Sequence, residues 1–264
     1  MNYIKIFGLP RSGTNFTKFL INKNTIDTEV VDNYPSNKHS LACYDEMLSI
    51  AKLDLSHNLR NKFLNLLEEK SLPIVICTKG FCSWVASYYR LQKKKYIYRN
   101  PGEDYPFDLK FATKFSNVWL DSVLYWDDFS KKHSTTTLMI SHQDLIVNPA
   151  ETLHKIIVKF NLKGVSDDFI LKVENQMKRG TGVEQGEELI EKESFFSHQY
   201  HIKSCWRKEV PPDVFTYLLK EENIIKKSHP HLNKYLQEEL YRPHSPRWLR
   251  YDLMRKAQGL NVWL

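Results

Sequence analysis

A short loop near the start of the chain gathers side chains that bind anions. Residues 8–14 (GLPRSGT) combine two glycines with an arginine and two hydroxyl side chains, and Asn15 follows them. Glycine lets the backbone approach a phosphate closely, Arg11 adds a permanent positive charge, and Ser12, Thr14 and Asn15 add side-chain donors. This density of donors favours an anion-binding loop over a plain turn.

The elements on either side place this loop where anions bind. Residues 3–8 (YIKIFG) have the composition of a strand, and a helical pattern begins at Thr14. A loop between a strand and a helix N-terminus presents unpaired N–H groups and the positive end of the helix dipole. The loop has the GxxxxG spacing of a P-loop kinase, but Thr14 stands where that loop has its lysine. A P-loop nucleotide-dependent kinase or NTPase is therefore the less favoured alternative.

Strands and helices alternate along most of the chain. Strand patterns recur at 28–32, 73–77 and 135–140, and helical patterns at 59–70, 81–95, 107–132 and 150–160. Such alternation predicts an α/β fold in three layers, a parallel β-sheet flanked by helices. From about residue 166 the chain is expected to be helical and polar, with a helix opening at Pro211–Pro212.

A second group of polar side chains follows the strand predicted at 73–77. Lys79 comes just after its end, and Ser87 and Arg90 lie on the helix that follows. The carboxyl ends of parallel strands meet at one edge of a sheet, where open α/β sheets bind ligands. These residues are therefore candidates for a second phosphate site beside the first. The alternative is two solvated charges and a hydroxyl that faces the core.

Residues 10–16 (PRSGTNF) resemble the 5′-phosphosulfate loop of the PAPS-dependent sulfotransferase superfamily, whose pattern is P-[KR]-S-G-T-[TN]-[WF]. The resemblance implies a P-loop-NTPase-like sulfotransferase fold. It also implies 3′-phosphoadenosine 5′-phosphosulfate (PAPS) as the donor and 3′,5′-adenosine bisphosphate as the product. It implies that the 5′-phosphate and the sulfuryl group are bound by Arg11, Ser12, Gly13, Thr14 and Asn15. It also implies that Phe16 lies near the adenine.

The second group resembles the family segment R-D-P-x-x-x-x-x-S-x-x-R, which binds the 3′-phosphate. Lys79, Ser87 and Arg90 fall on its Arg, Ser and Arg, with Lys replacing the first Arg and Gly-Phe replacing Asp-Pro. Lysine keeps the charge but loses the bidentate fork of arginine. The late R-K-G segment of the family has no match at the expected position, and Tyr200 or Lys203 is the candidate to replace it.

A hydroxyl that accepts a sulfuryl group must lose its proton, and histidine titrates in the range suited to take it. Family members often carry a Lys-His pair after the second strand, which here is Lys38–His39. The resemblance makes His39 the base and lets Lys38 and Arg11 stabilise charge on the transferred group. The alternative is a surface Lys-His pair in a turn-rich loop. A zinc site built on His198, His201 and Cys205 is disfavoured, and no metal is expected.

Composition sets the class of protein. The formal charge is +7, with 42% hydrophobic and 26% charged residues, which describes a soluble globular domain and excludes disorder and collagen. No apolar run approaches the roughly 20 residues of a membrane span, and no secretory signal opens the chain, so a cytoplasmic location is expected. Four cysteines without a CxxC pair indicate reduced thiols.

We expect a sulfotransferase domain over residues 1–240 and a basic amphipathic extension over 241–264. A non-enzymatic alternative takes this extension and the lysines at 93–95 as a patch for nucleic acid or a membrane surface. Nucleic acid is not expected as a partner, whereas peripheral contact of the extension with a membrane stays open. Aromatic residues within 96–111 suit a sugar, so a saccharide is the expected acceptor, ahead of a small aromatic or lipid alcohol.

Overall fold

The computed structural model describes residues 2–54, 56–164 and 205–236. Its centre is a parallel sheet of four strands in the order β3-β1-β4-β5. The predicted α/β architecture with a parallel sheet is thus confirmed. A second, two-stranded antiparallel sheet joins β2 to β6. The strands are β1 (Asn2–Gly8), β2 (Thr25–Ile26), β3 (Thr28–Val31), β4 (Ile74–Thr78), β5 (Thr137–Ser141) and β6 (Lys163–Gly164).

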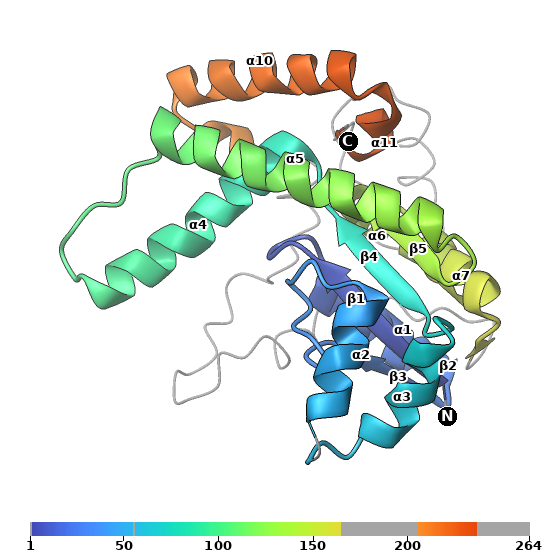
Figure 1. Cartoon of the computed structure of the whole chain (residues 1–264). Helices are drawn as coiled ribbons and strands as arrows, with labels where there is room; N and C mark the ends of the chain where they lie inside the picture. The colour runs from blue at the N-terminus through green and yellow to red at the C-terminus, as the bar shows by residue number, and fades with distance from the viewer. Residues whose placement is uncertain (1, 55, 165–204, 237–264) are drawn as a thin grey trace, which may run out of the picture.

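Helices cover both faces of the parallel sheet (Figure 1). On one face, α1 (Thr14–Asn24) and α7 (Pro149–Phe160) pack on Ile4 and Ile6 of β1. On the other face, Tyr3 and Phe7 of β1 pack against α2 (Tyr44–Leu53), α3 (Arg60–Glu68) and the end of α5. Because successive strand residues point to opposite faces, β1 is buried on both sides.

A third cluster of buried residues joins the long helices beyond the carboxyl ends of the strands (Figure 1). It lies between α4 (Phe81–Arg99), α5 (Leu109–Lys132) and α10 (Pro212–Ser228), and Trp84 and Trp119 are among its largest members. The remaining short elements are α6 (His142–Val147), η2 (Cys205–Glu209), η3 (Pro230–Leu232) and α11 (Asn233–Leu236).

Most predicted elements occur within a few residues of their expected bounds. The helix expected at Pro211–Pro212 is α10, which begins at Pro212. Two helices were not predicted, α2 and α6. The proposed domain boundary at residue 240 and the extension that follows it lie outside the described residues. In the part of the chain that the structure describes, no helix combines the length and the hydropathy needed to cross a membrane.

Candidate active site

The loop between β1 and α1 depends on its two glycines. Gly8 has φ +154°, and a Cβ there would come within 2.5 Å of the Cys77 carbonyl oxygen on β4 and of Ser12 Oγ. Gly13 has φ +96° and forms the N-cap of α1. A side chain at either position would meet strain or a clash, so the loop can fold this tightly only with glycine there.

Arg11 adopts a backbone conformation that non-glycine residues seldom use. Its φ is +74°, in the left-handed region. Such a residue costs about 1–3 kcal/mol and persists where the surrounding structure imposes it, often at functional sites. Here the strained residue is also the one that carries the positive charge of the loop.

The N-terminus of α1 is open to an anion. No side chain caps it, and its first turn holds no acidic residue. The hydroxyl of Ser12 is buried, and its Oγ has no hydrogen-bond partner within the described residues. Unpaired N–H groups at a helix start and an unsatisfied buried hydroxyl both call for an acceptor from outside the protein.

The second predicted phosphate site lies beside the first. Gly8 at the end of β1 is in register with Cys77 on β4, so the segments that follow both strands leave the sheet together. Ser87 on α4 is 1% exposed, and its Oγ accepts a hydrogen bond of 3.3 Å from Arg11 Nε. The structure therefore brings together two predicted binding residues that are 76 positions apart.

Two tryptophans that the sequence analysis did not select fix the backbone of these segments. Trp84 on α4 donates from Nε1 to the Pro10 carbonyl at 2.8 Å. Trp119 on α5 donates from Nε1 to the Lys79 carbonyl, also at 2.8 Å. A buried indole N–H needs an acceptor, but the sequence alone does not indicate which one. Both segments predicted to bind phosphate are thus tied to the helices of the third cluster.

Three of the remaining candidates lie in different surroundings. Lys79 is 3% exposed, just before the start of α4. Arg90 forms an ion pair with Glu209, with 3.3 Å between Nε and Oε2. A phosphate at Arg90 must therefore share the guanidinium with this carboxylate or displace it.

Phe16 is 2% exposed within the core between α1 and the sheet. It helps to anchor α1 there, and its implied place near adenine stays a prediction.

Lys38 and His39 are held against the end of β1. The Gly8 N–H donates to the Lys38 carbonyl at 3.0 Å, and His39 Nδ1 lies 2.7 Å from the Gly8 carbonyl oxygen. A carbonyl only accepts, so Nδ1 carries the ring proton and Nε2 has the free lone pair of the neutral ring. His39 is therefore in the tautomer that a general base requires.

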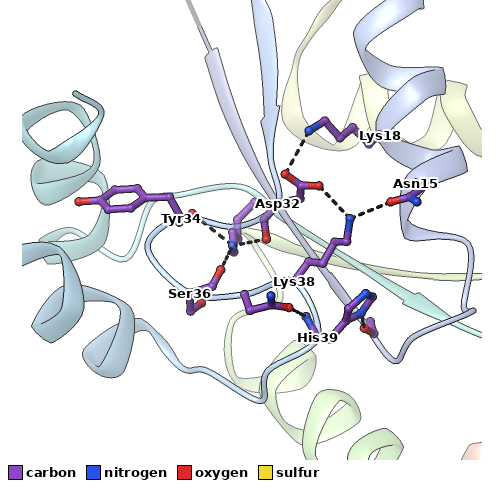
Figure 2. A network of polar contacts seen from close by, with 10 residues as sticks. Asn15, Lys18, Asp32, Tyr34, Ser36, Lys38 and His39 are labelled. Carbon is purple, nitrogen blue, oxygen red and sulfur yellow. Dashed lines mark hydrogen bonds and ion pairs between the residues drawn. The ribbon is translucent and has the colours of Figure 1, made fainter. Parts of the chain in front are cut away.

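The ammonium of Lys38 links its own segment to the first turn of α1 (Figure 2). It donates to Asn15 Oδ1 at 2.7 Å and to Asp32 Oδ2 at 2.8 Å. Lys18 of α1 contacts the other oxygen of Asp32 at 3.1 Å. Burial raises the pKa of Asp32, but hydrogen bonds from both lysines outweigh it and hold this pKa below its ordinary value. Asp32 therefore stays ionised and keeps Lys38 beside α1.

Burial makes His39 a weaker base than a free histidine. It lowers the pKa of the ring below the ordinary value of 6.5, although the hydrogen bond to Gly8 acts in the opposite direction. The ring is therefore neutral at pH 7 and ready to take a proton.

Other candidates lie outside the described residues, namely Tyr200, Lys203, His198 and His201. Within the described ranges, no group of three or more His, Cys, Asp or Glu side chains is placed to hold a metal ion.

The comparison with protein families decides the class of this site. A family model described as a sulfotransferase domain matches residues 2–220. The chain belongs to the sulfotransferase domain family. The matched region of this sulfotransferase includes the loop at 8–14, the segment at 79–90 and the Lys38–His39 pair. Membership implies a transferase that moves a sulfuryl group. The comparison with curated proteins finds no match to this sulfotransferase.

Proposed function

We propose that the protein transfers a sulfuryl group from PAPS to an acceptor hydroxyl. The observation that carries this proposal is the hydrogen bond from Arg11 to Ser87, because it joins the two segments expected to bind the two phosphates of the donor. One guanidinium in contact with both segments suits an adenosine that carries a phosphate at each end of its ribose. The open N-terminus of α1 and the unpartnered Ser12 hydroxyl also support it.

In this proposal, the first loop binds the 5′-phosphate and the sulfuryl group through Arg11, Ser12, Gly13, Thr14 and Asn15. The 3′-phosphate is bound by Lys79, Ser87 and Arg90, with Tyr200 or Lys203 completing the donor site. Ser87 is buried against Arg11, so it orients that guanidinium in addition to any contact with the phosphate.

The proposed reaction is an in-line displacement at sulfur. The acceptor oxygen forms a bond to sulfur while the bond from sulfur to the bridging phosphate oxygen breaks. His39 Nε2 takes the acceptor proton, and 3′,5′-adenosine bisphosphate leaves with the electrons of the broken bond. Positive charge from Arg11 and Lys38 stabilises the charge that develops on the bridging oxygen. The ammonium of Lys38 is positioned for this task by Asn15 and Asp32.

A thermal-shift experiment tests the donor. At 100 times its Kd, 3′,5′-adenosine bisphosphate should stabilise the protein by about 2.7 kcal/mol, which raises Tm by roughly 5–10 °C. ATP with Mg²⁺ tests the kinase alternative, and a mixed-sequence oligonucleotide tests the nucleic-acid alternative. A larger shift with ATP than with the bisphosphate, at matched concentrations, would contradict the proposed donor.

The dependence of turnover on pH tests the base. His39 accepts a proton only when its ring is neutral, and its pKa lies below 6.5. We therefore expect kcat/KM for the donor to fall as the pH is lowered, through one ionisation below 6.5, because this ratio reports the groups of the ligand-free enzyme. The measurement is kcat/KM for the donor against pH. An acid limb centred above 6.5 would show that another group controls the rate.

A saccharide is the proposed acceptor. The expected acceptor region at 96–111 spans the end of α4 and the start of α5, where Tyr96 lies 5.0 Å from Tyr105 between ring centroids and Tyr98 is 88% exposed. Aromatic faces with polar edges suit sugar rings. A screen of labelled sulfate transfer to saccharide, phenolic and lipid alcohols identifies the acceptor class, and transfer only to the latter two would overturn this choice.

A further inference from the structure

A lysine is buried in the middle of β1. Lys5 alternates with Tyr3 and Phe7 on the sheet face covered by α2 and α3, and it is 0% exposed. Its Nζ lies 4.9 Å from the centroid of the Phe7 ring. The remaining residues from Tyr3 to Phe7 are all hydrophobic, so the lysine interrupts a continuous hydrophobic strand.

The Lys5 ammonium donates to three backbone carbonyls of one segment. Its Nζ lies 3.0 Å from the Asp32 oxygen and 3.2 Å from the Tyr34 oxygen, and it also contacts the Ser36 oxygen. In its charged form the amine has three N–H donors, one for each of these acceptors. Figure 2 shows the dashed contacts of Asp32, Tyr34 and Ser36 converging on one side chain.

These three carbonyls belong to the segment that leads to the base. Residues 32–36 follow β3, and Ser36 is two positions before Lys38. The far end of the same segment is bonded to Gly8 through Lys38 and His39. Lys5 and Gly8 are both on β1, so one strand holds this segment at both of its ends.

Packing alone does not require a lysine here. Burial lowers the pKa of Lys5 to about 7, with the charges of Lys38 and Lys18 acting in the same direction and that of Asp32 opposing them. This depression reflects the cost of burying an ammonium, which an apolar side chain on the same face would avoid. The three backbone carbonyls are the groups that the Lys5 amine stabilises, because without it they would lose the hydrogen-bond donor that they share.

We propose that Lys5 is a positioning residue for the catalytic base, setting the path of residues 32–36 so that His39 is held against the end of β1. The inference rests on the proposed role of His39. It assigns to Lys5 no contact with donor or acceptor. Its effect on the reaction passes through the orientation of the His39 ring.

The first test is Lys5→Met, which keeps the length of the side chain and removes its donors. We expect kcat to fall by roughly 10- to 100-fold, since a displacement of about 1 Å at a reacting group costs that much. The Kd for 3′,5′-adenosine bisphosphate should change by a smaller factor than kcat, because the hydrogen bond between Arg11 and Ser87 is made outside residues 32–36, which reach the donor site through the contact of Lys38 with Asn15. Lys62→Met is the control, since the hydrogen bond and the ring contact described for Lys62 are both with Tyr3 on the same strand.

A spectroscopic measurement separates positioning from a loss of stability and needs no acceptor. Nitrogen-15 NMR of the His39 ring reports its tautomer and pKa. In the unaltered protein we expect the proton on Nδ1 and a pKa below 6.5. In Lys5→Met the ring should become a mixture of tautomers with a pKa closer to 6.5. An unchanged His39 spectrum would overturn the proposal, even if kcat fell.

A double-mutant cycle gives the decisive comparison. If Lys5 acts through His39, then Lys5→Met should lower the residual rate of His39→Ala by less than about 2-fold. A full 10- to 100-fold loss in that background would overturn the proposal. If Lys5→Met does not fold, Lys5→Gln, which keeps two donors, enters the same cycle and should give an intermediate kcat. A wild-type rate in His39→Ala would instead refute the base, whatever the Lys5 variants do.

Discussion

Replacing His39 with alanine should lower the rate of sulfuryl transfer by about 10²- to 10⁴-fold, the range over which positioned proton transfer contributes to catalysis. The physical reason is the tautomer: Nδ1 is bonded to the Gly8 carbonyl, so Nε2 is the acceptor for the proton of the attacking hydroxyl. The Kd for 3′,5′-adenosine bisphosphate should stay within about 2-fold, because His39 contributes no cation to the donor. Single-turnover rates and calorimetric titration measure the two quantities.

A second variant at this position separates proton transfer from loop anchoring. In His39→Asn the amide N–H can replace Nδ1 as the donor to Gly8, but no base remains. It should therefore be as slow as His39→Ala while keeping the native thermal stability. His154→Ala removes an exposed histidine of α7 and is the control, expected to be fully active. Turnover of either His39 variant near the control rate would refute the base assignment.

Replacing Arg11 with alanine should raise the Kd for 3′,5′-adenosine bisphosphate by about 10- to 150-fold, which corresponds to the loss of one charged hydrogen-bonding partner worth about 1.5–3 kcal/mol. The loss is large because Arg11 is the cation of the phosphate loop and also contacts Ser87. Calorimetric titration of each variant measures it. The control is Lys23→Ala, which removes one positive charge from the last turn of α1, the helix that follows the loop. It should leave the Kd within about 2-fold.

The backbone of Arg11 supplies a further control. Glycine adopts a φ of +74° without penalty, so Arg11→Gly should be more stable than Arg11→Ala by up to about 1–3 kcal/mol. Both variants should lose donor affinity equally. If the two variants lose the same donor affinity but differ in stability, the loss of affinity is due to the guanidinium. A donor affinity that follows the stability of the variants, or that does not change, would contradict the proposed role of Arg11.

The fold was largely predictable because its strands are short apolar runs between helical patterns. β4 is buried along its whole length, as its sequence IVICT indicates. α2 was not predicted, although Tyr44, Met47 and Ala51 have the spacing of a buried helix face. The sequence signal for α6 is weaker, because this helix has only about one and a half turns. It is capped by Ser141, whose Oγ accepts a hydrogen bond from the Asp144 N–H.

The candidate site was predictable only in part. Local motifs identify the anion loop and the Lys-His pair, because the chemistry of each lies within a few neighbouring residues. The contacts that join them are long-range, such as that of His39 Nδ1 with the Gly8 carbonyl oxygen. A lone lysine in a strand pattern, such as Lys5, has no signal of burial. Phe16 has a local pattern of burial, since its spacing from Leu20 places both on the core face of α1, and its implied place near adenine stays a prediction.

Both backbone groups of Gly8 are engaged by Lys38 and His39, the segment proposed to carry the base, and the same residue begins the loop that is proposed to bind the donor. The proposed base and the proposed donor loop are therefore fixed to the same strand end, so a shift of that end would move both and change the distance between them little. Movement of the surrounding helices would then have little effect on how the proposed base and donor are aligned.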